Sequence, residues 1–277
     1  YIDESWVEYF FVGKKSNSTK IPIANYDVID NNIFYTSLST NIKKKYNGKY
    51  KIVEQTFWFG TDRFGRDLLS RIIYGVRVSI AVGLIAVIIS LIIGISLGLI
   101  AGFYRGRVDD IIMWFVNVIW SIPTLLMVIA ITLALGKGFW QVFVAVGLTM
   151  WVEVARIVRG QVMAIRELEY VEASKVLAYS PFRIITKHIL PNVIGPVIVI
   201  SAANFAAAIL IEAGLSFLGI GAQPPIPSWG SIIKDHYSYI IMDKAYLAII
   251  PGIAIMLLVL SFMTIGNSLR DAFDVRD

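Results

Sequence analysis

The sequence predicts an all-α protein that crosses a membrane several times. Of its 277 residues, 57% are hydrophobic and only 16% are charged, whereas about a quarter of the residues in a soluble domain are charged. The mean hydropathy is +0.69, and several apolar runs reach the roughly 20 residues that a membrane span requires. A soluble enzyme could not bury this much apolar surface, so we expect these runs to lie in lipid.

The chain changes character abruptly after a polar N-terminal segment, residues 1–77, which contains no run long enough to span a membrane. Residues 78–103 then carry no charge at all, and as a helix they would be about 39 Å long. Gly94, Gly98 and Gly102 recur every fourth residue, which places them on one helix face that a neighbouring helix could approach closely. The alternative is that glycine is simply common in membrane helices.

The rest of the chain, residues 78–277, is expected to form the transmembrane domain with five visible spans. Pro123 lies inside the second apolar run and predicts a kink there. The turn at residues 136–138 separates the second span from the third, and a polar, helix-prone loop at residues 161–191 follows the third. The spans are predicted at residues 78–103, 111–135, 139–158, 193–217 and 246–266.

Lysine and arginine are distributed unequally between the two sets of short loops. The links at residues 104–110, 156–192 and beyond 266 hold ten of these residues, whereas residues 136–138 and 218–245 hold three. The ten-residue side is therefore expected to be cytoplasmic, and residues 1–77 to be extracytoplasmic. Because a chain that starts outside needs a helix to deliver it there, we expect a sixth, N-terminal span upstream of Tyr1.

The sequence contains few residues that could form a catalytic site. It contains no cysteine, which excludes disulfides, thiolate metal sites and a cysteine nucleophile. The two histidines, His188 and His236, fall on opposite sides of the predicted membrane and cannot share a metal ion. No phosphate-binding loop of the Gly-x-x-x-x-Gly-Lys-Ser/Thr type is present. We therefore expect no enzyme, no cofactor or metal in this chain, and no nucleic-acid partner.

The cytoplasmic loop at residues 161–191 is predicted to form two short helices with a corner between them. Tyr179 and Ser180 end the first helix, while Ser180 can cap the second and Pro181 suits its first position. Pro191 is expected to stop this second helix where the fourth span begins. A compact helical projection between two spans is suited to docking a cytosolic partner.

This loop resembles the EAA motif of ABC importer permeases, which runs Glu-Ala-Ala, three residues, Gly, nine residues, Ile-x-Leu-Pro. Glu172, Ala173 and Ser174 take the opening positions, Ala178 takes the glycine position, and residues 188–191 provide the ending His-Ile-Leu-Pro. An alanine with positive φ would cost roughly 1 kcal/mol. We therefore expect the corner at Ala178 to have a different geometry in this chain.

A second resemblance precedes the first visible span. The turn in residues 59–71, followed by Gly-Val-Arg-Val-Ser at 75–79, is similar to the signature of dipeptide and oligopeptide permeases of the second, "C" type. The alternative is an ordinary charged surface turn. Residues 213–219, 223–230 and 268–274 also resemble that subunit. The signature residues are Gly60, Thr61, Asp62, Gly65, Arg66 and Asp67.

The resemblance implies a type I ABC importer permease fold in the cell membrane of a prokaryote. It further implies import of di- or oligopeptides together with a second permease subunit, one or two ATP-binding subunits and an extracytoplasmic substrate-binding protein. ATP and Mg would belong to the partner subunits, and membrane lipid would surround the spans. Two alternatives stay open: the same class of importer carrying nickel or metal chelates, and an ion-driven secondary transporter.

The resemblance also assigns residues. In such permeases the corner is the coupling helix that docks on an ATPase, and here it comprises Glu172, Ala173, Ser174, Leu177, Ala178, Tyr179, Ser180 and Pro181. Our hypothesis is that Glu172 accepts hydrogen bonds while Ala173, Leu177 and Tyr179 pack in a groove of the partner. Glu212 is a carboxylate within the fourth span. It is either bonded within its helix near the interface or part of the substrate pathway.

Overall fold

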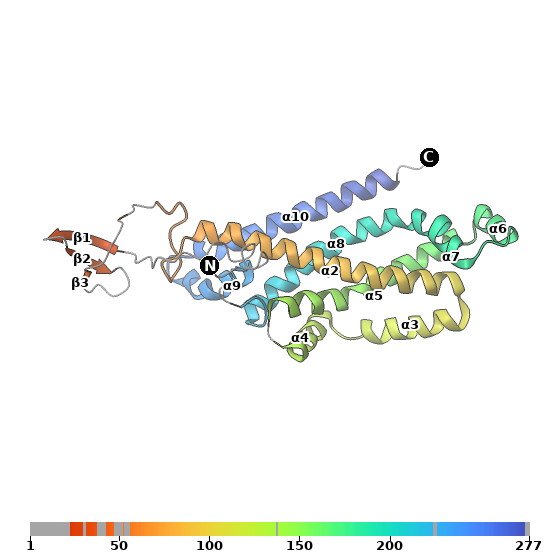
Figure 1. Cartoon of the computed structure of the whole chain (residues 1–277), viewed down its shortest axis with the longest axis horizontal. Helices are drawn as coiled ribbons and strands as arrows, with labels where there is room; N and C mark the ends of the chain where they lie inside the picture. The colour runs from red at the N-terminus through yellow and green to blue at the C-terminus, as the bar shows by residue number, and fades with distance from the viewer. Residues whose placement is uncertain are drawn as a thin grey trace, which may run out of the picture. The chain divides into compact units, whose positions relative to one another are not determined.

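The computed structural model describes residues 23–29, 32–37, 43–46, 52, 56–136, 138–223 and 226–274. The chain divides into two compact units, Tyr1–Tyr74 and Gly75–Asp277, and each is considered by itself (Figure 1). The helix that opens the membrane part, α2 (Leu68–Tyr104), begins within the first unit.

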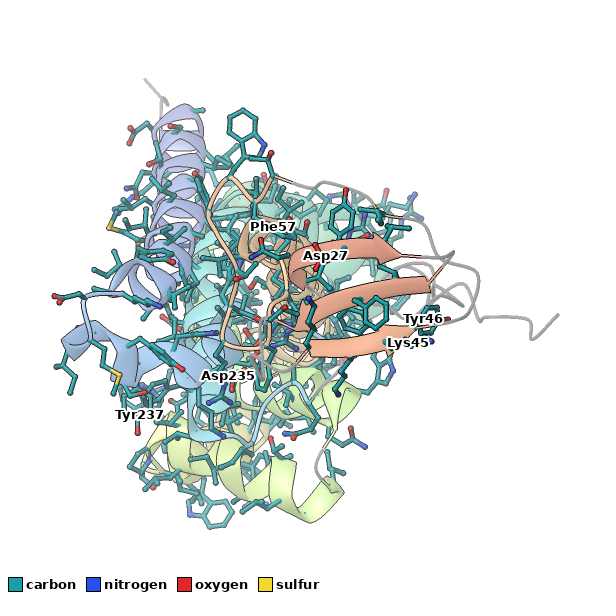
Figure 2. The ribbon with its side chains drawn as sticks, turned by 90° about the vertical axis from the view of Figure 1, so that its left-hand side faces the viewer. Asp27, Lys45, Tyr46, Phe57, Asp235 and Tyr237 are labelled. Carbon is teal, nitrogen blue, oxygen red and sulfur yellow. The ribbon has the colours of Figure 1, made fainter. Side chains whose placement is uncertain are left out.

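The first unit contains a small antiparallel sheet that the all-α prediction missed. Its strands β1 (Ile23–Ile29), β2 (Asn32–Ser37) and β3 (Lys43–Tyr46) lie in that order. Figure 2 labels Asp27 on one edge strand and Lys45 and Tyr46 on the other. Ile33 of the central strand is buried, and it pairs with Val28 on one side and Tyr46 on the other. Short strands in a polar segment bury few side chains, so the composition of residues 1–77 did not indicate them.

The second unit is helical, as predicted. Among the residues that the structure describes, four helices are long and apolar enough to cross a membrane, and a bent pair can supply a fifth span. The four stretches are Leu68–Tyr104, Trp140–Ile165, Pro181–Leu218 and Tyr246–Ala272. They belong to α2, α5 (Phe139–Ile165), α8 (Leu190–Leu218) with the short helices before it, and α10 (Tyr246–Asp274).

The second predicted span takes a different form from the one expected. In place of one kinked helix over residues 111–135, the chain forms α3 (Gly106–Trp120) and α4 (Thr124–Leu135), which meet at 90°. Pro123 lies between them as the N-cap of α4. Proline has no N–H to donate and disfavours helical geometry in the residue before it, so the helix ends and restarts there.

The glycines of α2 form the contact face that their spacing predicted. A Cβ atom added at Gly94 would lie 2.6 Å from Val154 Cβ of α5, and one at Gly98 would lie 2.7 Å from the Ala155 carbonyl oxygen. These distances are too short for any side chain, so the absence of a Cβ lets α2 and α5 pack backbone against backbone.

Phe205 of α8 stacks on Phe262 of α10 with ring centroids 3.9 Å apart.

The remaining helices form the two ends of the second unit. At one end, α9 (Trp229–His236) and the 3₁₀ helix η2 (Tyr237–Ile241) pack on α8 and α10. At the other end lie α6 (Glu169–Val176), α7 (Pro181–Ile184) and the π-helical turn η1 (Ile185–Ile189), as Figure 1 shows.

Candidate functional site

The predicted cytoplasmic loop forms a folded projection, which we call the arm (residues 166–189). The α7 start is confirmed: Pro181 occupies the first turn, and the Ser180 hydroxyl accepts a hydrogen bond from the Arg183 backbone N–H at 3.4 Å. This bond satisfies one of the N–H groups that have no partner at a helix start. The arm is therefore two helices joined by a defined corner.

The geometry expected at Ala178 was wrong. Its φ is 59°, the left-handed conformation that favours glycine. Ala178 N–H donates to the Lys175 carbonyl at 2.9 Å, and Tyr179 N–H donates to the Ser174 carbonyl at 3.2 Å. This pair of bonds is the Schellman motif that ends many helices. The corner thus keeps the glycine-type geometry of the EAA pattern although an alanine occupies the position.

Pro191 was also misjudged, because no helix ends there. The helical stretch continues from Pro181 to Leu218. The five residues of η1 widen the turn just before the proline, so that Leu190 N–H donates to the Ile185 carbonyl. The Asn192 side chain donates to the His188 carbonyl at 2.7 Å. A π-turn thus accommodates the missing proline N–H without ending the helix.

Ionic contacts hold the base of the arm to the bundle. Arg159 of α5 binds Asp109 of α3 through two bonds of 2.5 and 2.6 Å. Arg105 pairs with Glu167 at 2.8 Å, and Arg166 donates to the Phe103 carbonyl of α2 at 2.5 Å. The bidentate pair fixes α5 relative to α3 just before the arm, and the start of the arm itself is bonded to the end of α2 and to Arg105, the residue that follows it.

The far end of the arm exposes apolar side chains. Val176 is 86% exposed, Phe182 77% and Leu177 65%. Sequence reasoning singled out Leu177 and missed the other two. The available signal was an apolar residue beside charged residues in a polar loop. Helical periodicity in this loop did not distinguish exposed apolar residues from buried ones. We call Val176, Leu177 and Phe182 the apolar tip.

The other predicted docking residues lie around this tip. Glu172 and Ala173 are exposed on α6, whereas Ser174 is buried and its hydroxyl donates to the Tyr170 carbonyl at 2.8 Å. Tyr179 is half-buried, stacks on His188 and lies under the Arg183 guanidinium at 4.1 Å. Its ring is therefore packed within the arm.

The signature turn before α2 is organised around Asp62, which is 4% exposed. One carboxylate oxygen accepts the backbone N–H groups of Phe64 (2.8 Å) and Arg66 (2.9 Å), and the other accepts Arg66 Nε at 2.6 Å. Gly60 and Gly65 have φ of 70° and 73°, a conformation that glycine adopts without strain. The carboxylate of Asp62 and the two glycines therefore determine the shape of this turn.

The same turn leads directly into the first helix. Thr61 and Asp67 form an isolated antiparallel bridge across it. Asp67 then accepts the Ser70 backbone N–H at 3.1 Å at the start of α2. All six signature residues lie together in this turn, where they shape the start of α2.

Glu212 lies in the last third of α8 and is 1% exposed. Its Oε1 accepts a hydrogen bond from the Ser216 hydroxyl at 2.6 Å, one helical turn further on. The carboxyl is thus bonded within its own helix.

Comparison with known proteins is consistent with this architecture. Residues 94–276 match the family model described as binding-protein-dependent transport system inner membrane component. The chain belongs to this family. It is therefore a membrane component of a binding-protein-dependent transport system, and not an enzyme in its own right.

Two relatives and one solved structure illustrate the likeness. The dipeptide transport system permease protein DppC of Bacillus subtilis (strain 168) is 42% identical over 217 residues, 78% of this chain and 68% of the relative. The glutathione transport system permease protein GsiD of Pectobacterium atrosepticum is 39% identical over 78% of this chain and 72% of the relative. An inward-facing structure of the MetNI methionine ABC transporter shares the fold, with a TM-score of 0.61 and 18% identity over 74% of this chain and 97% of that one.

Proposed function

We propose that this chain is one of two permease subunits of an ATP-driven importer of di- or oligopeptides. The names of its relatives support the substrate class, because they include dipeptide permeases and the oligopeptide transport system permease protein OppC of Bacillus subtilis, 39% identical over 217 residues. An extracytoplasmic binding protein would deliver the peptide, and the second permease would complete the path. Import of nickel or metal chelates by the same class remains the alternative.

The observation that carries the coupling mechanism is the apolar tip. Val176, Leu177 and Phe182 are exposed on a short projection whose other end is held by the Arg105–Glu167 ion pair and by the bond from Arg166 to the Phe103 carbonyl. An isolated apolar side chain on a surface is ordinary, but a group on a projecting corner favours a protein partner. We assign that partner as the ATP-binding subunit, where ATP and Mg would be bound and the hydrolysis would take place.

The construction of the arm explains how closure of the partner would move the membrane helices. The arm has two short helices, a Schellman corner and a Tyr179 ring packed inside it. Its helical stretch is continuous with α8, and its first turn is bonded to the Phe103 carbonyl of α2 and to Arg105. A displacement of the tip would therefore reach α8 and the end of α2 as a rigid-body motion.

Glu172 supplies the polar part of the proposed contact. It lies in the first turn of α6, where a negative charge complements the helix dipole. Its exposed carboxylate is available to donors of the partner. A lysine at this position would repel such donors while leaving the buried side of α6, formed by Val171 and Ser174, unchanged.

The test is ATP-dependent uptake of a labelled dipeptide by the complete transporter in proteoliposomes. We expect Glu172→Lys and Phe182→Ser to insert and assemble with the second permease, yet to lose most uptake and most binding of the ATP-binding subunit. Asp271→Lys makes the same charge change at an exposed carboxylate of α10, off the arm, and should retain uptake. Normal uptake by both arm variants would contradict the coupling role.

The ion-driven alternative is separated by the energy source. The proposed importer should accumulate peptide when ATP is present and an ionophore has removed ion gradients. Uptake that collapses with the gradient but persists with a hydrolysis-deficient ATP-binding subunit would favour an ion-driven carrier instead.

A further inference from the structure

The exposed side of α5 differs between the two halves of this helix. In the half far from the arm, which we call the outer half, the exposed side chains are apolar, with Trp140 50% and Val144 37% exposed. In the half that leads to the arm, the inner half, the exposed residues include Glu153 and Gly160. Because successive residues of a helix are about 100° apart, Glu153 and Gly160 lie on the opposite side of α5 from Trp140 and Val144.

The side of α5 that carries Glu153 is closed in the outer half and open in the inner half. Val142, Val146 and Thr149 lie on this side by helical spacing, and they are 1%, 0% and 8% exposed. A Cβ atom added at Gly160 would meet nothing within 4 Å. α3, α4 and α8 all pack on α5 (Figure 1). Together these helices leave one side of α5 uncovered only near the arm, within the part of the chain that the structure describes.

Glu153 places a carboxylate within a membrane span on this open side. It lies near the middle of the 27-residue helix α5, about 9 Å further from the arm than Arg159 along the helix axis. Among the described residues, Glu153 has no hydrogen-bond or ionic partner. A charge that faces hydrocarbon is costly, and ionisable side chains within membrane spans face a water-filled cavity or a charged partner in almost all cases. We therefore expect water, and not lipid, beside Glu153.

The positive charge next to Glu153 on α5 is directed towards another helix. Arg156 lies one turn away, but its guanidinium stacks on Trp120 of α3, 3.6 Å from the ring centroid, and donates to the Asn117 side chain of the same helix. Arg156 therefore does not pair with the carboxylate of Glu153. A negative charge beside water attracts cations and repels anions that pass close to it, so Glu153 would act on any charged solute on this side of α5.

We propose that the inner half of α5 lines a water-filled part of the peptide path, and that Glu153 gives this path a preference for positively charged peptides. The groups that Glu153 would attract are the α-ammonium group of a peptide and the side chains of lysine and arginine. This assignment rests on the proposed transport function and adds to it a charge selectivity that belongs to the permease. Glu153 is thus a specificity-determining residue, and its contribution is separate from that of the binding protein.

The first measurement tests whether water reaches Glu153 in the assembled transporter. A membrane-impermeant thiol reagent is added from the side of the arm, without peptide or ATP, and labelling of this chain is followed. The chain contains no native cysteine, so Glu153→Cys introduces a single site, which we expect to be labelled. Val176→Cys, at a position of the arm that is 86% exposed, is the positive control. Val144→Cys, on the apolar side of the same helix, should stay unlabelled.

The second measurement compares uptake of a lysine-containing dipeptide with uptake of a glutamate-containing one by the complete transporter in proteoliposomes. The ratio of the two rates does not depend on the amount of assembled transporter, and the binding protein contributes the same factor in every variant. Glu153→Gln should lower this ratio roughly fivefold, as for one charge pair at close range in water, and Glu153→Asp should preserve most of it. Asp271→Asn removes an exposed carboxylate of α10 and should leave the ratio unchanged.

An unlabelled Glu153→Cys would overturn the assignment, because a position covered by lipid or by the second permease gives that result. An unchanged ratio in Glu153→Gln would overturn the charge selectivity, even if uptake of both dipeptides fell, since a proportional loss indicates a structural role. Labelling requires neither peptide nor ATP. A transporter that shows the expected labelling but imports neither dipeptide would therefore contradict the proposed function, while the water-filled side of α5 would still hold.

Discussion

The arm exposes apolar side chains to the surroundings, whereas the opposite end of the bundle, where α9 packs on α8, buries polar ones. Val176 and Phe182 are more than three-quarters exposed, while Glu212, Ser216 and Ser228 are almost completely buried. The arm is the surface that we propose for the ATP-binding subunit, whereas the contacts at the opposite end come from residues of this chain.

The largest expected effect separates the two ends of the bundle. Gly230→Ala places a Cβ atom against the Ala213 carbonyl oxygen at 2.2 Å, and relieving this clash should destabilise the packing of α9 on α8 by about 3 kcal/mol. The midpoint of thermal unfolding in detergent should fall, while binding of the ATP-binding subunit to the folded protein stays normal. Gly252→Ala is the control, because open space surrounds that glycine. Loss of partner binding in Gly230→Ala would show that the two ends are not independent.

A smaller effect is expected where α5 meets α3, just before the arm. Arg159→Ala leaves Asp109 without its bidentate partner, at a site where the arginine side chain is 28% exposed and the aspartate 11%. The expected loss of stability is about 2 kcal/mol, measured as a lower midpoint of thermal unfolding in detergent. Arg107→Ala, at an exposed neighbour in α3, should cost little.

The double variant Asp109→Ala/Arg159→Ala sharpens this test. Because the two residues act as a pair, its loss should be well below the sum of the two single losses. Strict additivity would contradict a direct interaction.

The smallest effect concerns the corner. Ala178→Gly relieves the positive φ of 59° and should stabilise the arm by about 0.5–1 kcal/mol. Ala173→Gly, inside α6, should destabilise it by about 1 kcal/mol. Opposite shifts of the thermal midpoint would support the left-handed corner, whereas a loss in both variants would refute it.

Local sequence signals located the arm and misjudged parts of its geometry. Ser180 and Pro181 predicted a helix start correctly, because capping depends on residues within one turn. Pro191 was expected to end a helix, but the π-turn η1 moves the hydrogen-bond register ahead of it. Ala178 was expected to avoid a positive φ, but the two Schellman hydrogen bonds and the stacked Tyr179 stabilise that corner.

The signature residues were predicted better than the apolar tip, because local contacts place the former and long-range contacts the latter. The six signature residues form one turn because Asp62 bonds to neighbours two and four residues away. The apolar tip was only partly foreseen, since the exposure of Val176 and Phe182 depends on which face of each short helix the bundle covers. The burial of Glu212 depends on how helices pack around the end of α8, which no local pattern describes.

The amino-acid sequence by itself determined that the chain crosses a membrane in apolar helices, where one polar loop becomes helical, and which glycines of α2 allow a close neighbour. These properties follow from composition, capping and helical spacing, which act over a few residues. Only the tertiary structure decided which apolar side chains of the arm stay exposed and that Glu212 of α8 is buried. Both depend on contacts between residues far apart in the chain, and the free energy of such contacts is absent from any short window of sequence.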